Sequence, residues 1–370
     1  GAAGFGTPVA VTAAILIGLG FSPLAASGLS LIANTAPVAF GALGTPVITL
    51  AQVHGYDLME VTAMIGRQLP FFSLLVPFWL IWAFAGRKAM WEIWPAILVT
   101  GLSFAIPQYL VSNYMGPELV DIIAAIVSML SLVAFLRVWQ PKKVWTSPAM
   151  RGRDPSASEA KPPQPVVRHS REALVAAWTP WLILSVFVFI WGLPPVKAWL
   201  NGIFAPKFPI EGLHNLVLKM PPVVTTPHPE AAVYTLNLLS ATGSGILLAA
   251  VISALVMKYK PLNIVRTFFS TVWLVRYSLL TIVLMLALGT LTRFSGTDTT
   301  LGLAFANTGW FYPFFGTLMG WIGVALTGSD TASNVLFGGM QKVAAEQLGL
   351  SPNLMGAANS SGGVMGKMID

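Results

Sequence analysis

Long apolar stretches alternate with short polar or basic ones along most of the 370-residue chain. A helix needs about 20 mainly apolar residues to cross the hydrocarbon core of a bilayer, which is ~30 Å thick and is crossed at about 1.5 Å per residue. The stretches that satisfy this requirement are 68–85, 93–112, 118–138, 173–192, 236–257, 268–291 and 301–326. The pattern predicts an all-α, polytopic transmembrane helix bundle.

Two further regions, 1–51 and 327–370, are apolar enough for the membrane but rich in Gly, Pro, Ser, Thr and Asn. Polar interruptions fall at 34–37, 327–334 and 359–363, and the first of them contains a proline, which disfavours helix. Non-helical backbone at membrane depth survives only where protein buries it or where it lines a watery cavity. We therefore expect broken or re-entrant helices here, as in inverted-repeat secondary transporters.

Each break creates helix ends whose free N–H groups attract an anion. Hydroxyl and amide side chains beside such ends can bind the carboxylate and the hydroxyl group of a small hydroxy acid together. The candidate substrate-binding residues are Asn34, Thr35, Ser329, Thr331, Ser333, Asn334, Asn359, Ser360 and Ser361. The alternative interpretation of any single break is a kink that serves helix packing, although three breaks of similar composition favour a site.

Asp330 is the candidate for proton coupling, because a carboxylate at membrane depth costs roughly 2.5–3.5 kcal/mol on insertion scales and protonation removes its charge. Ser329, Asp330 and Thr331 are also capping residues, so Asp330 is equally a candidate helix N-cap, or serves both purposes. Arg276 lies inside a predicted span, where it either packs or neutralises a substrate carboxylate. Lys367 follows the third break closely enough to be a candidate counter-charge.

The two ends of the chain resemble each other. The sequence LGFSP at 19–23 is followed eleven residues after its proline by Asn34, and LGLSP at 348–352 is followed seven residues after its proline by Asn359. The difference corresponds to about one helical turn. A composition rich in small residues produces weak matches of this kind by itself. The other interpretation is a structural repeat, whose interrupted segments point to the midplane binding site of a transporter.

The composition agrees with a membrane protein and argues against several other classes. Apolar residues make up 55% of the chain and charged residues only 9%, whereas soluble domains carry about 25% charged residues. There is no cysteine, which excludes disulfides and thiolate catalysis, and the four histidines lack the spacing of a zinc site. The net charge of +7 comes from basic residues beside apolar spans, which argues against nucleic-acid binding. We predict no catalytic residue, metal or cofactor.

Lys and Arg collect in the loops 86–92 and 258–267 and in the stretch 139–172. With alternating spans all three fall on one side, which the positive-inside rule assigns to the cytoplasm. The stretch 139–172 is also rich in Pro and Ser, as solvated linkers are. The sequence therefore predicts an N-terminal membrane part at 1–138, a cytoplasmic basic linker at 139–172 and a C-terminal membrane part at 173–370.

A set of short motifs covers nearly all of the chain in a fixed order. They are GAAGFGTPVAVTAA (1–14), LIANTAPVAFGALGTP (31–46), GRQLPF (66–71), GPELVDII (116–123), MPPVV (220–224), SATGSGILLAA (240–250), LTGSDTASNVLF (326–337) and NSSGGVMGKMI (359–369). In these motifs the sequence resembles the L-lactate permease family. Each motif alone is weakly specific, and together they are specific.

The resemblance implies a multi-pass protein of the bacterial inner (plasma) membrane that imports lactate, and in some members glycolate, with protons. Its partners are then a small monocarboxylate, protons and the lipid bilayer, and its oligomeric state is not predicted. The resemblance places the candidate residues given above near the site, but Arg276 is not part of the family pattern. It also leads us to expect that the chain is the inner part of a longer protein.

Three other classes of function are alternatives to a proton-coupled carrier of lactate or glycolate. A sodium-coupled carrier of another small carboxylate is the principal alternative, because unwound carbonyls and hydroxyls suit Na⁺ equally well. A membrane enzyme would need a nucleophile–base pair or metal ligands at membrane depth, where only Asp330, Arg276 and Lys367 are ionisable candidates. A proton-conducting subunit of a larger complex should carry Lys and Glu in several span centres, and 68–85 and 93–112 have none.

Overall fold

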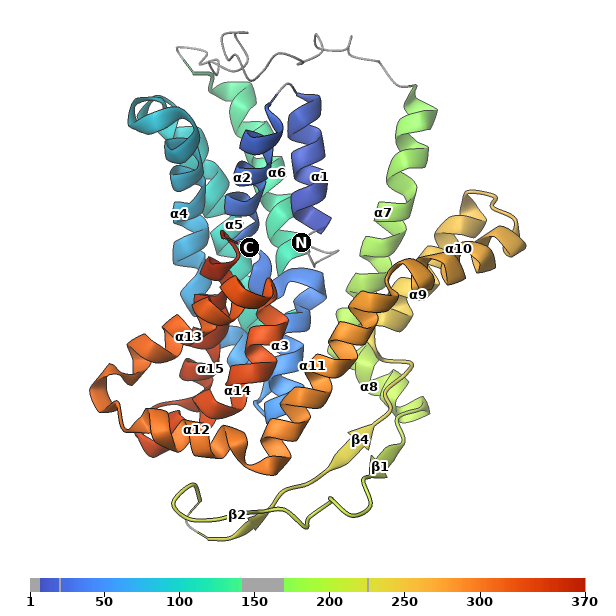
Figure 1. Ribbon diagram of the computed structural model, residues 1–370. Coiled ribbons are helices and arrows are strands. Elements are labelled where there is room, and N and C mark those ends of the chain that lie inside the picture. Colours follow the sequence, from blue (N-terminus) through green and yellow to red (C-terminus); the bar gives the residue numbers. More distant parts are fainter. Residues whose placement is uncertain (1–6, 20, 142–169, 225, 370) are drawn as a thin grey trace. The chain divides into compact units, whose positions relative to one another are not determined.

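The structure of the protein is a computed structural model that describes residues 7–19, 21–141, 170–224 and 226–369 (Figure 1). It is mainly helical with a few short strands, so the predicted all-α fold class is confirmed. The chain forms two compact units. The first combines Gly1–Val166 with Ala304–Asp370, and the second is Val167–Leu303. The C-terminal residues therefore pack with the N-terminal ones, and the compact units differ from the two halves expected on either side of the linker.

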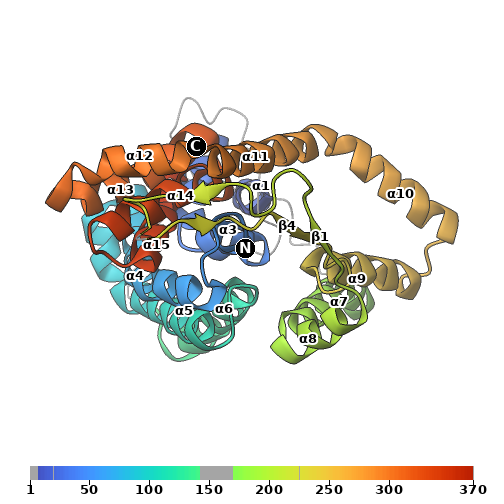
Figure 2. The ribbon, with the colours of Figure 1, turned by 90° about the horizontal axis from the view of Figure 1, so that it is seen from below.

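The first unit has an N-terminal and a C-terminal group of helices. The N-terminal group consists of α1 (Thr7–Gly18), α2 (Pro23–Asn34), the 3-10 turn η1 (Val38–Phe40), α3 (Gly41–His54), α4 (Leu58–Glu92), α5 (Trp94–Tyr114) and α6 (Val120–Val138). The C-terminal group consists of the 3-10 turn η4 (Gly309–Phe311), α13 (Tyr312–Thr327), α14 (Asp330–Gln347) and α15 (Pro352–Gly366). The two groups meet where α14 packs against α3 and α15 packs against α4 (Figure 2).

Four predicted spans correspond to long apolar helices. The spans 68–85, 93–112, 118–138 and 173–192 lie in α4, α5, α6 and α7 (Arg171–Gly192), which are long and apolar enough to cross a membrane. The interior of the protein buries only 6% of the apolar window of α7 and 33% of that of α5. Apolar surface left uncovered to this extent is what a helix in lipid presents. These four predictions are confirmed.

The other three predicted spans differ from the structure. The span 236–257 contains α9 (Thr242–Val256), which is 15 residues long. The span 268–291 is bent by 56° between α10 (Pro261–Leu274) and α11 (Arg276–Ser295). The span 301–326 divides into α12 (Thr297–Ala306) and α13, because a turn ends the first helix and Pro313 stands at the start of the second.

Of the three expected basic stretches, one is helical and another lies mostly outside the described residues. The segment 86–92 is helical and belongs to α4, which kinks at Gly86 (φ +82°) and continues to Glu92. Glycine tolerates this positive φ without a steric penalty. Most of the expected linker, residues 142–169, lies outside the described residues, and Ser170 caps α7 by accepting a hydrogen bond from Ala173 N at 3.2 Å.

The second unit joins the helices α7 to α11 through a strand-containing segment. It contains α8 (Pro194–Ile203), β1 (Lys207–Pro209), β2 (Leu218–Lys219), β3 (His228–Pro229) and β4 (Val233–Thr235). β1 pairs antiparallel with β4, and β2 pairs antiparallel with β3. Glu230 connects this segment to α11, since it accepts a hydrogen bond from Arg293 Nε at 2.8 Å and pairs with Lys219 Nζ at 3.0 Å.

Substitution of Glu230 by Gln should destabilise the second unit by on the order of 1–2 kcal/mol at neutral pH. Burial raises the pKa of Glu230, but the bonds from Lys219 and Arg293 outweigh it and hold the pKa below its ordinary value. A lowered pKa contributes stability above the ordinary carboxyl pKa, and this contribution is lost as the pH falls through the lowered value. Thermal unfolding at pH 7 and pH 3 measures both effects.

The exposed Glu211 provides a matched control on the same segment. Glu211→Gln should unfold like the unmodified protein at both pH values. The difference between the unmodified protein and Glu230→Gln should shrink at pH 3. A difference that stays the same at pH 3 would show that the ion pairs of Glu230 contribute nothing to the stability of the folded state.

Candidate functional site

α14 and α15 form a helical hairpin whose two N-termini are both capped by serine. Ser329 Oγ accepts a hydrogen bond from Ala332 N at 3.2 Å, and Ser351 Oγ accepts one from Leu354 N at 3.4 Å. Both serines have extended backbone, which N-cap residues favour. The break expected at 327–334 is therefore only two residues long, because the helix resumes at Asp330.

A buried polar cluster lies where this hairpin packs against α3. Ser360 Oγ donates to Asp330 Oδ2 at 2.7 Å. Asn334 Nδ2 donates to the same carboxylate oxygen at 3.4 Å, to Ser360 Oγ at 3.2 Å and to the Pro46 carbonyl at 3.3 Å. All three side chains are at most 3% exposed. The helices α14, α15 and α3 thus converge on one carboxylate.

The cluster continues along α14 as a chain of amide hydrogen bonds. Asn359 Nδ2 donates to Asn334 Oδ1 at 2.9 Å, and Gln341 Nε2 donates to Asn359 Oδ1 at 3.2 Å and to the Gly316 carbonyl at 2.7 Å. Tyr312 OH donates to Gln341 Oε1 at 2.6 Å. The bonds between these side chains run in one direction, from Tyr312 through Gln341 and Asn359 to Asn334, which in turn donates to Asp330, and they fix the orientation of each amide.

The expected break at 359–363 is not present, because α15 is helical throughout Pro352–Gly366. Small residues here serve close packing of α13 and α15. An ideal Cβ on Gly362 would overlap the Thr317 carbonyl oxygen, and one on Gly320 would come within 2.9 Å of Asn359 Cα. The glycines let the two helix backbones touch, as small residues do in membrane proteins, and they do not unwind the helix.

Two buried polar atoms of this region have no hydrogen-bond partner within the described part of the chain. They are Asp330 Oδ1 and Ser361 Oγ. Asp330 Oδ1 faces Gly363, where an ideal Cβ would overlap it. Burying a polar atom without a partner costs about 1–3 kcal/mol, so such atoms indicate a proton, water or ligand that the site binds. In the same described residues, no three His, Asp or Glu side chains are grouped as a metal site requires.

The remaining candidates on the hairpin have mainly structural contacts. Ser333 Oγ donates to the Gly320 carbonyl at 3.1 Å, and Ser329 is the N-cap. Thr331 is buried in the first turn of α14. Lys367 Nζ donates to the Gly328 carbonyl at 2.7 Å, so its charge lies at the C-terminal end of α13. The ammonium group thus binds a carbonyl at a helix C-terminus, where a positive charge is favourable.

Asn34 and Thr35 are buried where α2 ends, and the hydrogen bond of the Thr35 side chain is local. α2 ends at Asn34, and Thr35 Oγ1 donates back to the Leu31 carbonyl at 3.4 Å. Gln108 Nε2 of α5 donates to the Ala36 carbonyl at 3.2 Å, which satisfies the turn that follows. No hydrogen bond connects these two side chains to the Asp330 cluster within the described ranges 7–19, 21–141 and 226–369. Hydrogen bonds therefore join candidates of the breaks at 327–334 and 359–363 in one cluster, and they do not connect Asn34 and Thr35 to it.

A family model described as L-lactate permease matches residues 1–370. The chain belongs to the L-lactate permease family. The glycolate permease GlcA of Escherichia coli strain K12 is 48% identical to it over 382 residues, and the L-lactate permease of Salmonella typhimurium is 47% identical over 378 residues. Each match covers all of this chain and 67% of the relative. The L-lactate permease of Bacillus subtilis is 43% identical over 390 residues, which covers 68% of that relative. No solved structure matches the chain.

Membership of this permease family and the long apolar helices make the protein a multi-pass membrane transport protein. Arg276, which was weighed as a substrate ligand, instead donates from Nη1 to the Trp273 carbonyl at 2.6 Å and stacks on the Trp273 and Tyr277 rings. These contacts place the guanidinium at the bend between α10 and α11. Packing, the alternative interpretation, fits them.

The sequence interpretation of this permease missed Gln341 and Tyr312. Both are fully buried and both belong to the amide chain. Gln341 lies seven residues after Asn334 and eleven after Asp330, which places all three on one face of α14. That spacing was readable from the sequence. Tyr312 had no comparable signal, because it is an isolated tyrosine at the start of an apolar helix.

We predict that Gln341→Leu weakens lactate binding by the permease and leaves its membrane insertion intact. The leucine fills a similar volume but deprives Asn359 of its donor and Tyr312 of its acceptor, which costs about 1–3 kcal/mol for each buried group. The freed amide of Asn359 can then rotate away from Asn334. Lactate uptake kinetics should show a KM at least about fivefold higher. Gln347→Leu, near the exposed end of the same helix, should leave the KM unchanged.

Proposed function

We propose that the protein is a secondary transporter that imports L-lactate or glycolate with protons across the bacterial plasma membrane. Relatives that match its whole length are bacterial and are named as permeases for these two acids. Both acids are small 2-hydroxy monocarboxylates. A site that binds them needs hydrogen-bond donors for the carboxylate and a donor or acceptor for the hydroxyl group next to it. The polar cluster of α14 and α15 offers amides, hydroxyls and one carboxylate within hydrogen-bond distance of one another.

The unpartnered Asp330 Oδ1 is the observation that carries this proposal. An ionised carboxylate buried beside an incoming substrate carboxylate would be strongly repelled, because two carboxylates that share a site cannot both be charged at low cost. Substrate and proton therefore bind together: the proton occupies Asp330 Oδ1, and the substrate carboxylate accepts a hydrogen bond from the Ser361 hydroxyl group, which has no partner in the described part of the protein. Release of either one favours release of the other.

The short helices support a re-entrant arrangement around this site. α1 and α2 have 12 residues each, so each is about 18 Å long and too short for ~30 Å of hydrocarbon. Ser22 caps α2 as Ser351 caps α15, each followed by a proline in the first turn of the helix. We propose that α1–α2 and α14–α15 are the corresponding hairpins of an inverted repeat, and that the basic helix ends face the cytoplasm.

Uptake of radiolabelled L-lactate into proteoliposomes tests the proposed function. An inward-directed pH gradient should drive accumulation, and a protonophore should abolish it. Replacement of Na⁺ by choline should have no effect, whereas a sodium-coupled carrier would stop. Accumulation that persists with the protonophore and disappears without Na⁺ would assign the coupling to sodium. Unlabelled glycolate should compete with lactate, and acetate, which lacks the hydroxyl group, should compete more weakly.

A further inference from the structure

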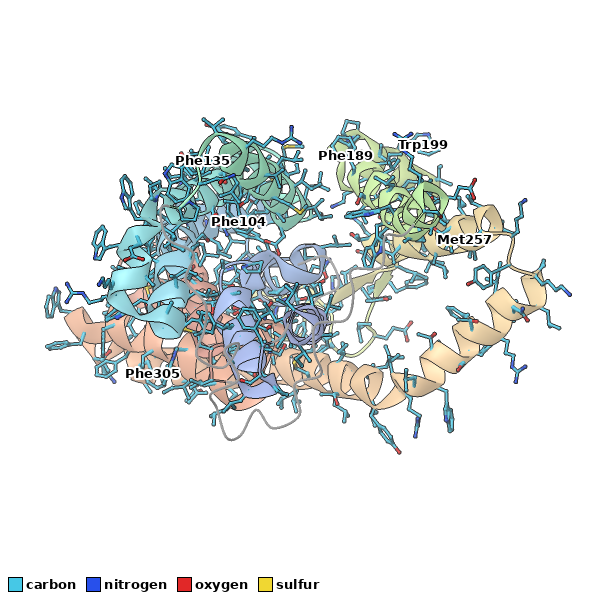
Figure 3. The ribbon with its side chains drawn as sticks, turned by 90° about the horizontal axis from the view of Figure 1, so that it is seen from above. Phe104, Phe135, Phe189, Trp199, Met257 and Phe305 are labelled. Atoms are coloured by element: carbon cyan, nitrogen blue, oxygen red, sulfur yellow. The ribbon has the colours of Figure 1, made fainter. Side chains whose placement is uncertain are left out.

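The first unit contains a largely apolar cavity whose lining includes none of the residues of the buried polar cluster. Its volume is about 500 Å³, which is in the range of ligand pockets. It is lined by α4, α5 and α6 together with the turn after α2. The wall includes Pro37, Ile81, Ile97, Leu132 and Leu136, together with Phe104 of α5, which Figure 3 labels.

The polar groups of this cavity are already satisfied by the protein. Ser73 Oγ donates to Gln108 Oε1 at 2.6 Å, Thr100 Oγ1 to the Ala96 carbonyl at 2.8 Å and Ser128 Oγ to the Thr100 carbonyl at 3.0 Å. These hydroxyl hydrogens are therefore not available to a carboxylate. The occupant that fits is a hydrocarbon chain, whose burial is favourable by about 0.8 kcal/mol per CH₂ group.

The cavity extends to the surface of the protein near one basic end of the helices. Leu136, which lines it, is 40% exposed and immediately precedes the exposed Arg137. Ile81 lies six residues before the exposed Arg87, with Lys88 next to it. Within residues 7–19, 21–141, 170–224 and 226–369 no acidic side chain forms a salt bridge with these three cations.

The same end has exposed tryptophans, which are typical of a membrane interface. Trp82, Trp91 and Trp94 are each at least 45% exposed there, and the Trp139 ring stacks on Phe135 at 5.5 Å between the ring centres. Exposed tryptophans of this kind lie at the level of lipid headgroups. One acid, Glu92, is exposed among the basic residues, so this end remains net positive.

We propose that the cavity binds one acyl chain of an anionic phospholipid of the bilayer, whose phosphate is held by Arg87, Lys88 and Arg137. Basic positions beside grooves between transmembrane helices bind anionic headgroups, and each cation near the surface contributes severalfold to the affinity. The bound chain packs against the turn that follows Asn34. The lipid is thereby part of the wall that supports this helix break.

Native mass spectrometry of the detergent-solubilised protein, titrated with phosphatidylglycerol or phosphatidylcholine, tests this proposal. The unmodified protein should retain one phosphatidylglycerol at least about tenfold more tightly than phosphatidylcholine. Arg137→Gln should weaken the binding of phosphatidylglycerol about fivefold and leave that of phosphatidylcholine unchanged. Leu132→Trp should weaken the binding of both lipids, because the indole projects into the cavity and narrows it.

Two matched variants control for the substitutions themselves. Arg67→Gln removes an exposed arginine from the opposite end of α4, and Leu130→Trp adds an indole at a position of α6 that is 62% exposed. Neither should change lipid retention. Equal affinity of the unmodified protein for both lipids would overturn the proposal. Full retention of phosphatidylglycerol by Arg137→Gln would also overturn it. Arg137 is exposed, so this test remains valid even if the Leu132→Trp variant does not fold.

Discussion

The Asp330→Asn variant should lose proton-driven accumulation of lactate down to background, but it should still exchange external lactate for lactate loaded inside proteoliposomes. Asparagine keeps an oxygen that can accept the hydrogen bond of Ser360, so the cluster stays assembled. It cannot bind or release a proton, and it imitates the protonated carboxyl permanently. The variant therefore binds substrate but no longer couples its movement to the pH gradient.

A matched substitution separates coupling from helix capping. Glu346→Gln, at the other end of α14 and exposed, should accumulate lactate normally. If Asp330 acted only as a favourable charge in the first helical turn, the asparagine variant would lose up to about 1 kcal/mol of stability and would still accumulate lactate. Full accumulation by Asp330→Asn would therefore remove the proton-coupling role and leave the structural one.

Substitution of Gly320 by Leu should abolish lactate uptake by separating α13 from α15. An ideal Cβ at Gly320 already overlaps the Asn359 carbonyl oxygen, and that atom is helix backbone that cannot rotate aside. Even alanine should cost about 1–3 kcal/mol, as overpacking of a close interface does. The larger side chain displaces the turn of α15 that carries both Asn359 and Ser360. Uptake rate and the melting temperature of the purified protein measure the two effects.

Gly28 offers a control of the same residue type in the same unit. It lies in α2, where an added Cβ meets no atom within 4 Å. Gly28→Ala should transport normally and should be no less stable, because alanine favours helix over glycine by about 1 kcal/mol. Normal transport by Gly320→Leu would show that the contact between α13 and α15 does not position the site.

The spans that were predictable from the sequence are those that face lipid on most of their surface. For α4, α5, α6 and α7 the length of the apolar stretch is enough to predict a spanning helix, because a helix in hydrocarbon needs only sufficient apolar length and internally bonded backbone. The bend at Val275 could not be predicted in this way. It has neither proline nor glycine, and the hydrogen bond from Arg276 to the Trp273 carbonyl three residues earlier has no signature in the apolar pattern.

The candidate site was predictable in its chemistry but not in its backbone. Gly362 and Gly363 have the composition of a break, and only the facing helix shows that they are packing positions beside Thr317 and Asp330. Sequence composition does not distinguish a glycine that unwinds a helix from one that lets another helix approach. Asn34 was grouped with Asn359 by similarity of motif, whereas the structure gives the turn after Asn34 a different partner in Gln108.

Cysteine accessibility at Ser361 tests most directly whether water and substrate reach the buried polar cluster. The chain contains no cysteine, so Ser361→Cys gives a single thiol, and the serine hydroxyl has no hydrogen bond to the described part of the protein that the substitution would break. We expect that a small charged thiol reagent modifies this cysteine in membranes and that L-lactate slows the reaction in proportion to its occupancy, while lactamide does not. A thiol that never reacts, or that reacts at the same rate with saturating lactate, would contradict this expectation.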